Sequence, residues 1–132
     1  MPEARILNEL RFNMVKGSLE VIESISSGPV LFLYKGVKEG PEEDLAAATA
    51  LIFLREKATA LGANVVALSH RTTLYHEDGR SGSPSRGEKV IYAIAYRFRP
   101  LPACGCGSEP SVHQPNCASE VERLDRVRAL EE

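Results

Sequence analysis

The chain has 132 residues, 43% hydrophobic and 26% charged, and its 16 basic and 18 acidic residues leave a net charge of −2. These values are typical of one soluble globular domain, and they exclude the broad positive surface that draws proteins to nucleic acid or to an anionic membrane. The N-terminus lacks the apolar run of a signal peptide, and no stretch reaches membrane-spanning length. We therefore expect a cytoplasmic protein with no membrane segment.

The first third of the chain contains several short segments. Residues 5–15 fit a strand and a helical face about equally well, and we favour the strand. Residues 19–25 are rich in β-branched side chains, which favours a second strand, and a turn follows at 26–29. The run VLFLYKGV at 30–37 predicts a strand that is central or covered on both sides.

A long helix is the clearest prediction. Gly40-Pro41 opens it, acidic residues follow in its first turn, and Gly62 closes it. Apolar residues at helical spacing predict its core-facing side, formed by Ala47, Leu51, Leu54, Ala58 and Leu61. Leu45, Ile52 and Phe53 widen this apolar stripe beyond what a small sheet can cover. We therefore expect a second surface to cover this stripe, either another subunit or a loop of the same chain.

Two strands and a loop come after the helix. Residues 64–77 alternate, residues 78–87 are a polar hairpin loop, and residues 89–98 return as a strand. Small alanines on one face of the last strand offer a floor for a helix, whereas its aromatic face needs a large cover, which again indicates assembly. In the first strand, alternation predicts one shared face for Val66, Leu68, His70, Thr72, Leu74 and His76.

The C-terminal part differs in character from the rest. Pro100 and Pro102 end the sheet, so we divide the chain into a core domain at 1–102 and a tail at 103–132. A capping box at Ser119 starts a final helix. Its thin apolar stripe, sufficient to dock on another element, consists of Val121, Leu124, Val127 and Leu130.

The tail also carries the strongest chemical signal. Cys104, Cys106, His113 and Cys117 have the spacing C-x-C-x6-H-x3-C. Three thiolates and one imidazole match a closed tetrahedral zinc site, whose role is structural because no position is left for water. Another soft metal would fit the same ligands. Two alternatives stay open: a disordered tail with incidental cysteines, or a disulfide between Cys106 and Cys117.

Other candidate residues lie near the hairpin. His70, His76 and Arg71 form a candidate ligand-binding group, although the ordinary interpretation is polar residues at the exposed end of a strand. The sequence shows no nucleophile elbow and no phosphate loop, so enzymatic chemistry is uncertain and a non-catalytic role is favoured.

The segment LREKATALGANVV at 54–66, followed by a strand, a polar loop and the closing strand VIYAIAYRF, resembles the YbjQ-type family of small bacterial proteins. The likeness covers roughly residues 30–98 and depends mainly on residues 60–66. It implies an α+β, dodecin-like fold: a three-stranded antiparallel sheet with one long helix packed on it, in subunits that form a ring such as a pentamer. The heavy-metal-binding label of the family transfers to no residue here.

These observations predict a non-catalytic metal-binding or assembly module that forms a homo-oligomer and carries a zinc site in its tail. One alternative is an adaptor that uses the tail to bind a protein or nucleic-acid partner. The other is a small-molecule binder or enzyme with a site at the subunit interface, near His70 and the hairpin.

Overall fold

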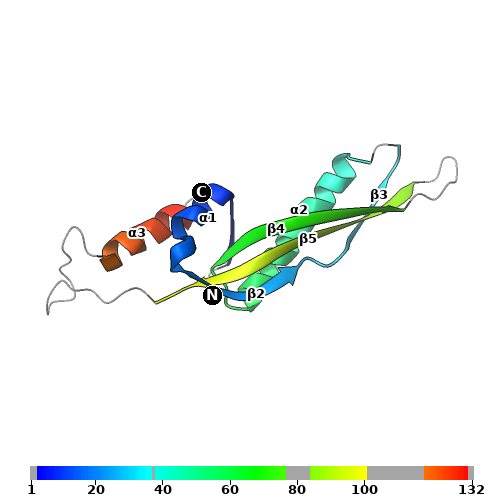
Figure 1. Ribbon diagram of the computed structural model, residues 1–132. Coiled ribbons are helices and arrows are strands. Elements are labelled where there is room, and N and C mark those ends of the chain that lie inside the picture. The colour runs from blue at the N-terminus through cyan, green and yellow to red at the C-terminus, as the bar shows by residue number, and fades with distance from the viewer. Residues whose placement is uncertain (1–2, 37, 77–83, 101–117, 131–132) are drawn as a thin grey trace.

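Five strands form one mixed sheet with three helices around it (Figure 1). The computed structural model describes residues 3–36, 38–76, 84–100 and 118–130. The strands follow the order β1-β4-β5-β2, and β3 pairs with β5 next to β2. The elements are β1 (Arg5–Leu7), α1 (Glu9–Val15), a 3₁₀ turn (Lys16–Ser18), β2 (Leu19–Ser26), β3 (Val30–Tyr34), α2 (Pro41–Ala60), β4 (Val65–His76), β5 (Ser85–Phe98) and α3 (Ala118–Leu130).

The prediction of a three-stranded antiparallel sheet with one long helix is therefore wrong. The strand β1 adds to β4 in parallel orientation, and β2 adds to β5. The 14-residue β5 is long enough to pair with both β2 and β3 along one edge. Buried Ser27 joins these two pairings, because its N–H donates to Ile91 O at 2.9 Å and its Oγ accepts from Ile91 N at 3.0 Å.

The N-terminal segment is a strand followed by a helix, whereas we favoured one strand over residues 5–15. Only three residues pair with β4 before Asn8 changes the direction of the chain. The Asn8 side chain accepts from the Arg11 N–H at 2.8 Å and caps α1, with Glu9 in the first turn. The cap makes the helix favourable despite its length of seven residues.

The long helix α2 confirms the predicted boundaries. Pro41 occupies its first turn, and Gly62 adopts a φ of +80°, which lets Ala63 N–H donate to Ala58 O at 2.9 Å. Its buried side differs from the predicted stripe, because Leu61 is 39% exposed and Ala47 and Leu51 are only partly buried. The fully buried positions are Ala46, Ala50, Leu54 and Ala58.

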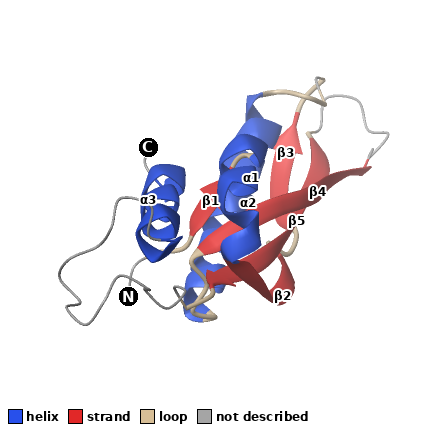
Figure 2. Cartoon of the chain, turned by 60° about the vertical axis from the view of Figure 1, so that its left-hand side comes forward, coloured by secondary structure: helices blue, strands red, loops and turns tan. Residues whose placement is uncertain are grey.

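Small side chains explain this shift. The predicted alanine floor on β5 exists, and Ala93 and Ala95 pack there with Ala50 and Ala58 of α2. Alanine on both surfaces lets the helix approach the sheet closely, so the larger residues of α2 lie at the flanks. Figure 2 shows α2 lying against the strands on one side of the sheet.

The face predicted for β4 is interrupted by a bulge. Leu68 pairs with Ala93 and His70 pairs with Tyr92, so Ser69 is an extra residue. Val66 and Leu68 consequently lie on the α2 side of the sheet, and His70 and the alternate residues after it lie on the opposite side. Sequence alternation placed all of them on one side, which is wrong.

Helices α1 and α3 gather at one end of the sheet (Figure 1). They cover a second core cluster made of Leu7, Val15, Leu19, Val65 and Ala129. The Arg126 guanidinium lies 4.6 Å from the Phe98 ring centroid and donates to Arg99 O at 2.7 Å, which fixes α3 against the end of β5. Of the predicted docking stripe of α3, Leu130 packs on this cluster, whereas Val121, Leu124 and Val127 are 40–46% exposed.

Among the residues that the structure describes, no helix combines the length and the apolar character needed to cross a membrane.

Candidate functional site

The four predicted zinc ligands, Cys104, Cys106, His113 and Cys117, all lie outside the described residues. The zinc site therefore stays a prediction. Within the described ranges, no group of three or more His, Cys, Asp or Glu side chains is arranged to hold a metal ion.

The three residues of the predicted ligand-binding group do not converge. The His70 ring stacks on Tyr92, with centroids 4.4 Å apart and an interplanar angle of 15°. His76 lies farther along the same face, where its Nε2 is 3.8 Å from Glu88 Oε1. Arg71 lies on the α2 side of β4, because it pairs with a buried residue of that side of β5. Ligand binding by these residues stays a prediction.

The described elements cover the face of the sheet opposite α2 only at one end, where α1 and α3 lie. Leu31 and Leu74 pair with Glu88 from its two sides, and Leu33 pairs with Arg86, so the three leucines share this face. Their side chains are exposed by 68%, 55% and 55% for Leu31, Leu74 and Leu33. Large aliphatic side chains on a sheet usually meet a second layer. Here no described element supplies one.

The same face continues toward α1 and α3. Val21 is 63% exposed where β2 passes Tyr96, and Tyr92 is exposed beside His70. Ile94 is half-buried between them, and Val90 is half-buried between Tyr92 and Glu88. We call this surface the open face; it consists of Val21, Leu31, Leu33, Leu74, Val90, Tyr92 and Ile94.

Open strand edges border the open face on both sides. In the described part of the chain, β4 has a partner on its outer edge only at residues 65–67, so residues 68–76 present unpaired backbone groups there. The outer edges of β2 and β3 also have no partner strand among the described residues. Unpaired edges next to an apolar surface are a template for pairing with another chain.

An apolar groove extends the open face around the edge of β3. It has a volume of about 620 Å³ and is lined by Leu31 and Leu33 from β3 and by Leu45 from α2. Leu45 is 70% exposed, and Ile52 and Phe53 are exposed farther along α2. The surplus apolar surface expected from the sequence is present in the structure.

A buried polar cluster lies on the opposite side of the sheet, under the first turn of α2. Lys89 Nζ donates to Glu43 Oε1 at 2.9 Å and to Thr73 Oγ1 at 2.8 Å. Tyr75 OH donates to Glu43 Oε2 at 2.7 Å, and Thr73 donates to Oε1 at 3.0 Å. Lys89 is 6% exposed. The cluster fixes the N-terminal end of α2 on β4 and β5, and the buried Tyr34 hydroxyl nearby has no hydrogen-bond partner among the described residues.

The protonation states of this cluster follow from its contacts. The hydrogen bond from Tyr75 lowers the pKa of Glu43, and the bonds from Lys89 and Thr73 lower it further, against the desolvation that raises it. The same hydrogen bond raises the pKa of Tyr75 to about 12. The carboxylate is therefore charged and the phenol is protonated near neutral pH. A protonated phenol cannot accept a proton as a base, so we assign a structural role to the cluster.

The sequence analysis missed this cluster. Its signal was that Lys89 alternates in phase with Ile91, Ala93 and Ala95, which places a lysine on the buried side of β5. A lysine in such a position needs an acidic partner. Glu43 was visible only as a charge in the first helical turn.

Comparisons with known proteins identify no relative: no family model matches this chain, and neither does a curated protein or a solved structure. The YbjQ-type resemblance stays a prediction.

Proposed function

We propose that this chain is a non-catalytic assembly module of the cytoplasm that forms a homo-oligomer through its open face. The observation that supports this most is the exposure of Leu31, Leu33 and Leu74 on one face of the sheet. Burying a leucine side chain contributes roughly 1.5–3 kcal/mol. Three such residues on one continuous face can offset much of the rotational and translational freedom lost in association.

The charges at the rim favour a second copy of the chain over a strongly charged partner. Arg86 and Glu88 lie two residues apart on β5, on the same side as the open face. A two-fold axis can therefore set Arg86 of each copy against Glu88 of the other. Pairing of this kind makes the same patch complementary to itself. The ring of subunits implied by the YbjQ-type resemblance stays a prediction.

The test is the mass of variants in solution. Leu31→Lys together with Leu74→Lys places two charges in the open face. We expect this double substitution to raise the dissociation constant of the oligomer at least tenfold. Leu10→Lys is the matched control, because Leu10 is 74% exposed on α1 and does not belong to the open face. Size-exclusion chromatography with light scattering, run with a reductant, measures both. An oligomer that survives the double substitution contradicts the proposal.

We also propose that the tail holds a structural zinc ion through Cys104, Cys106, His113 and Cys117. The proposal is supported by the number and softness of the ligands. Metal analysis of protein purified without added zinc should find about one zinc per chain, since one site has four ligands. Cys104→Ser should lose most of it. A metal content that does not differ between the two proteins contradicts the site.

Two experiments distinguish this proposal from the two alternatives that the sequence left open. Partner capture that is lost on deleting residues 103–132 would favour an adaptor. A small molecule that co-purifies with the oligomer and is lost in His70→Ala would favour a site at the subunit interface, near the His70–Tyr92 stack.

A further inference from the structure

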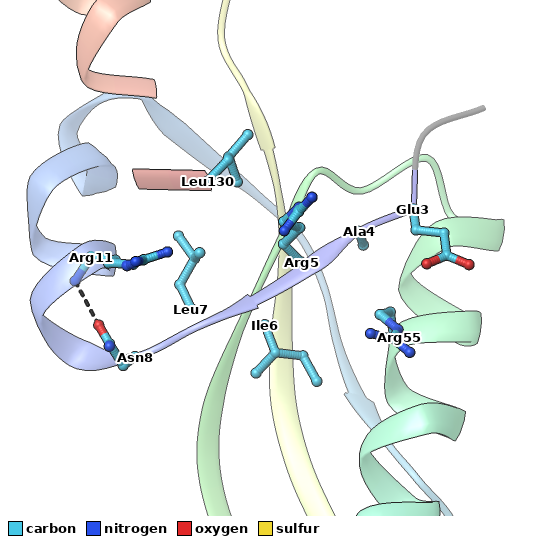
Figure 3. A pocket seen from close by; sticks show the side chains of 9 residues that line it. All are labelled: Glu3, Ala4, Arg5, Ile6, Leu7, Asn8, Arg11, Arg55 and Leu130. Carbon is cyan, nitrogen blue, oxygen red and sulfur yellow. Dashed lines mark hydrogen bonds between the residues drawn. The ribbon is translucent and has the colours of Figure 1, made fainter. Parts of the chain in front are cut away.

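A polar cavity lies where β1 passes between α1 and α2. It has a volume of about 560 Å³, which is within the range of small-molecule sites. Three arginines from three different elements line it: Arg5 of β1, Arg11 of α1 and Arg55 of α2. Leu7 and Leu130 contribute apolar surface (Figure 3).

The charge of this cavity contrasts with that of the chain. Among the described residues that line it, the charged side chains are Arg5, Arg11, Arg55 and Glu3, so arginine predominates. The whole chain has a net charge of −2. Arginine side chains gathered on one cavity of an acidic protein favour an anionic ligand, because the planar guanidinium binds carboxylate and phosphate oxygens in pairs.

The backbone that carries the arginines is fixed by packing and hydrogen bonds. Ala4 is fully buried, and its N–H donates to Thr59 Oγ1 of α2 at 2.9 Å. Arg5 N–H donates to Asn64 O at 3.0 Å, next to β4. The backbone N–H of Arg11 donates to the Asn8 side chain that caps α1. A site whose backbone is ordered before binding loses less entropy when the ligand enters.

The positions of the side chains restrict the shape of the ligand. Figure 3 shows Arg11 and Arg55 at opposite ends of the cavity, with Leu7 and Arg5 between them. Leu130 lies beside this middle part. A molecule with an anionic group at each end and a less polar middle matches this order of side chains.

We propose that this cavity binds a small organic molecule with anionic groups at its two ends, either carboxylates or phosphates. Arg11 and Arg55 each bind one end of the ligand. Leu7 and Leu130 contact the middle of the ligand. The cavity is lined by β1, α1, α2 and α3 and shares no residue with the open face, so this proposal does not depend on assembly.

Isothermal titration calorimetry at constant ionic strength tests the site. The two-ended probes are glutarate and fructose 1,6-bisphosphate, and acetate and inorganic phosphate are the single-group comparisons. We expect saturable binding of one probe per chain, at least tenfold tighter than the matching single-group anion. Absence of saturable binding for both two-ended probes overturns the proposal.

Substitutions locate the binding in this cavity. Arg11→Gln and Arg55→Gln should each weaken binding of the two-ended probe at least fivefold, and Arg55→Lys should be intermediate because it keeps charge but loses paired donors. Arg71→Gln removes an exposed arginine outside the cavity and should change binding less than twofold. Thermal unfolding without ligand checks that each variant is folded. Equal binding by wild type and Arg55→Gln, with both folded, contradicts the site.

Discussion

The two faces of the central sheet differ in how their apolar residues are covered. On the α2 side, Ala93 and Ala95 of β5 meet the alanines of the helix and are almost fully buried. On the opposite side, Leu31 and Leu74 flank Glu88 and are more than half exposed. Both faces belong to the same strands, so β-sheet formation itself does not explain the difference.

Small side chains explain why the α2 side of the sheet is covered. Alanines allow a helix of the same chain to lie close to the sheet, and the space that remains is filled by Leu54. The open face has large side chains, and no described element is matched to them. Charged residues also differ between the two faces. Lys89 is buried under α2 and pairs with Glu43, whereas Arg86 and Glu88 border the open face.

The largest effect is expected in the covered core. Leu54→Ala should lower the free energy of unfolding by about 2–5 kcal/mol, because it leaves a cavity between α2 and the sheet. Leu10→Ala removes the same atoms from an exposed position on α1 and should change it by less than about 0.5 kcal/mol. Urea unfolding measures both. Equal losses would mean that the core does not lie under α2.

The buried ion pair is the next test of the covered face. Lys89→Met should cost about 3–5 kcal/mol, because Glu43 is left charged and buried without its cationic partner. The double variant Lys89→Met with Glu43→Leu should recover at least half of this loss. As a control, Arg97→Met breaks the exposed pair with Glu20 and should cost less than about 1 kcal/mol. If the double variant is no more stable than Lys89→Met, the charge left behind is not the cause.

A smaller effect is expected in acid. The pKa of Glu43 is lower in the folded state than its ordinary value of 4.5, so its contribution is present above that value and is lost as pH falls through the folded pKa. Wild type should therefore lose more stability than Glu43→Gln between about pH 5 and pH 3. Urea midpoints across this range measure the difference. Parallel curves for the two proteins would show that the hydrogen-bond partners of Glu43 do not lower its pKa.

The smallest effect concerns Tyr75. Its pKa is raised from 10.0 to about 12, so its contribution to stability is complete below pH 10 and is lost as pH rises toward 12. Ultraviolet absorbance of phenolate should show a titration step near pH 12. Tyr75→Phe should remove that late step. A late step that persists in Tyr75→Phe would assign it to another tyrosine.

Strong local signals predicted part of the fold. Pro41 and Gly62 marked the ends of α2, and alternation identified most of β4 and β5. The three-residue β1 depends on pairing with β4 and has too few residues to show a period. The bulge at Ser69 is a property of register between two strands, which neither strand encodes alone.

The sites were predictable to different degrees. Surplus apolar surface was visible in sequence as Leu45, Ile52 and Phe53, and the structure adds the three exposed leucines of the sheet. The arginine cavity was not visible, because its arginines are up to 50 residues apart and meet only through the placement of β1 between two helices. The zinc ligands lie outside the described residues.

Sedimentation equilibrium of the wild-type protein over a wide concentration range tests the role of the open face most directly. We expect a mass that is a multiple of the 14.4 kDa chain and that falls toward the mass of one chain only on strong dilution. A mass of 14.4 kDa at every concentration, with the leucines of the sheet exposed to solvent, would contradict it.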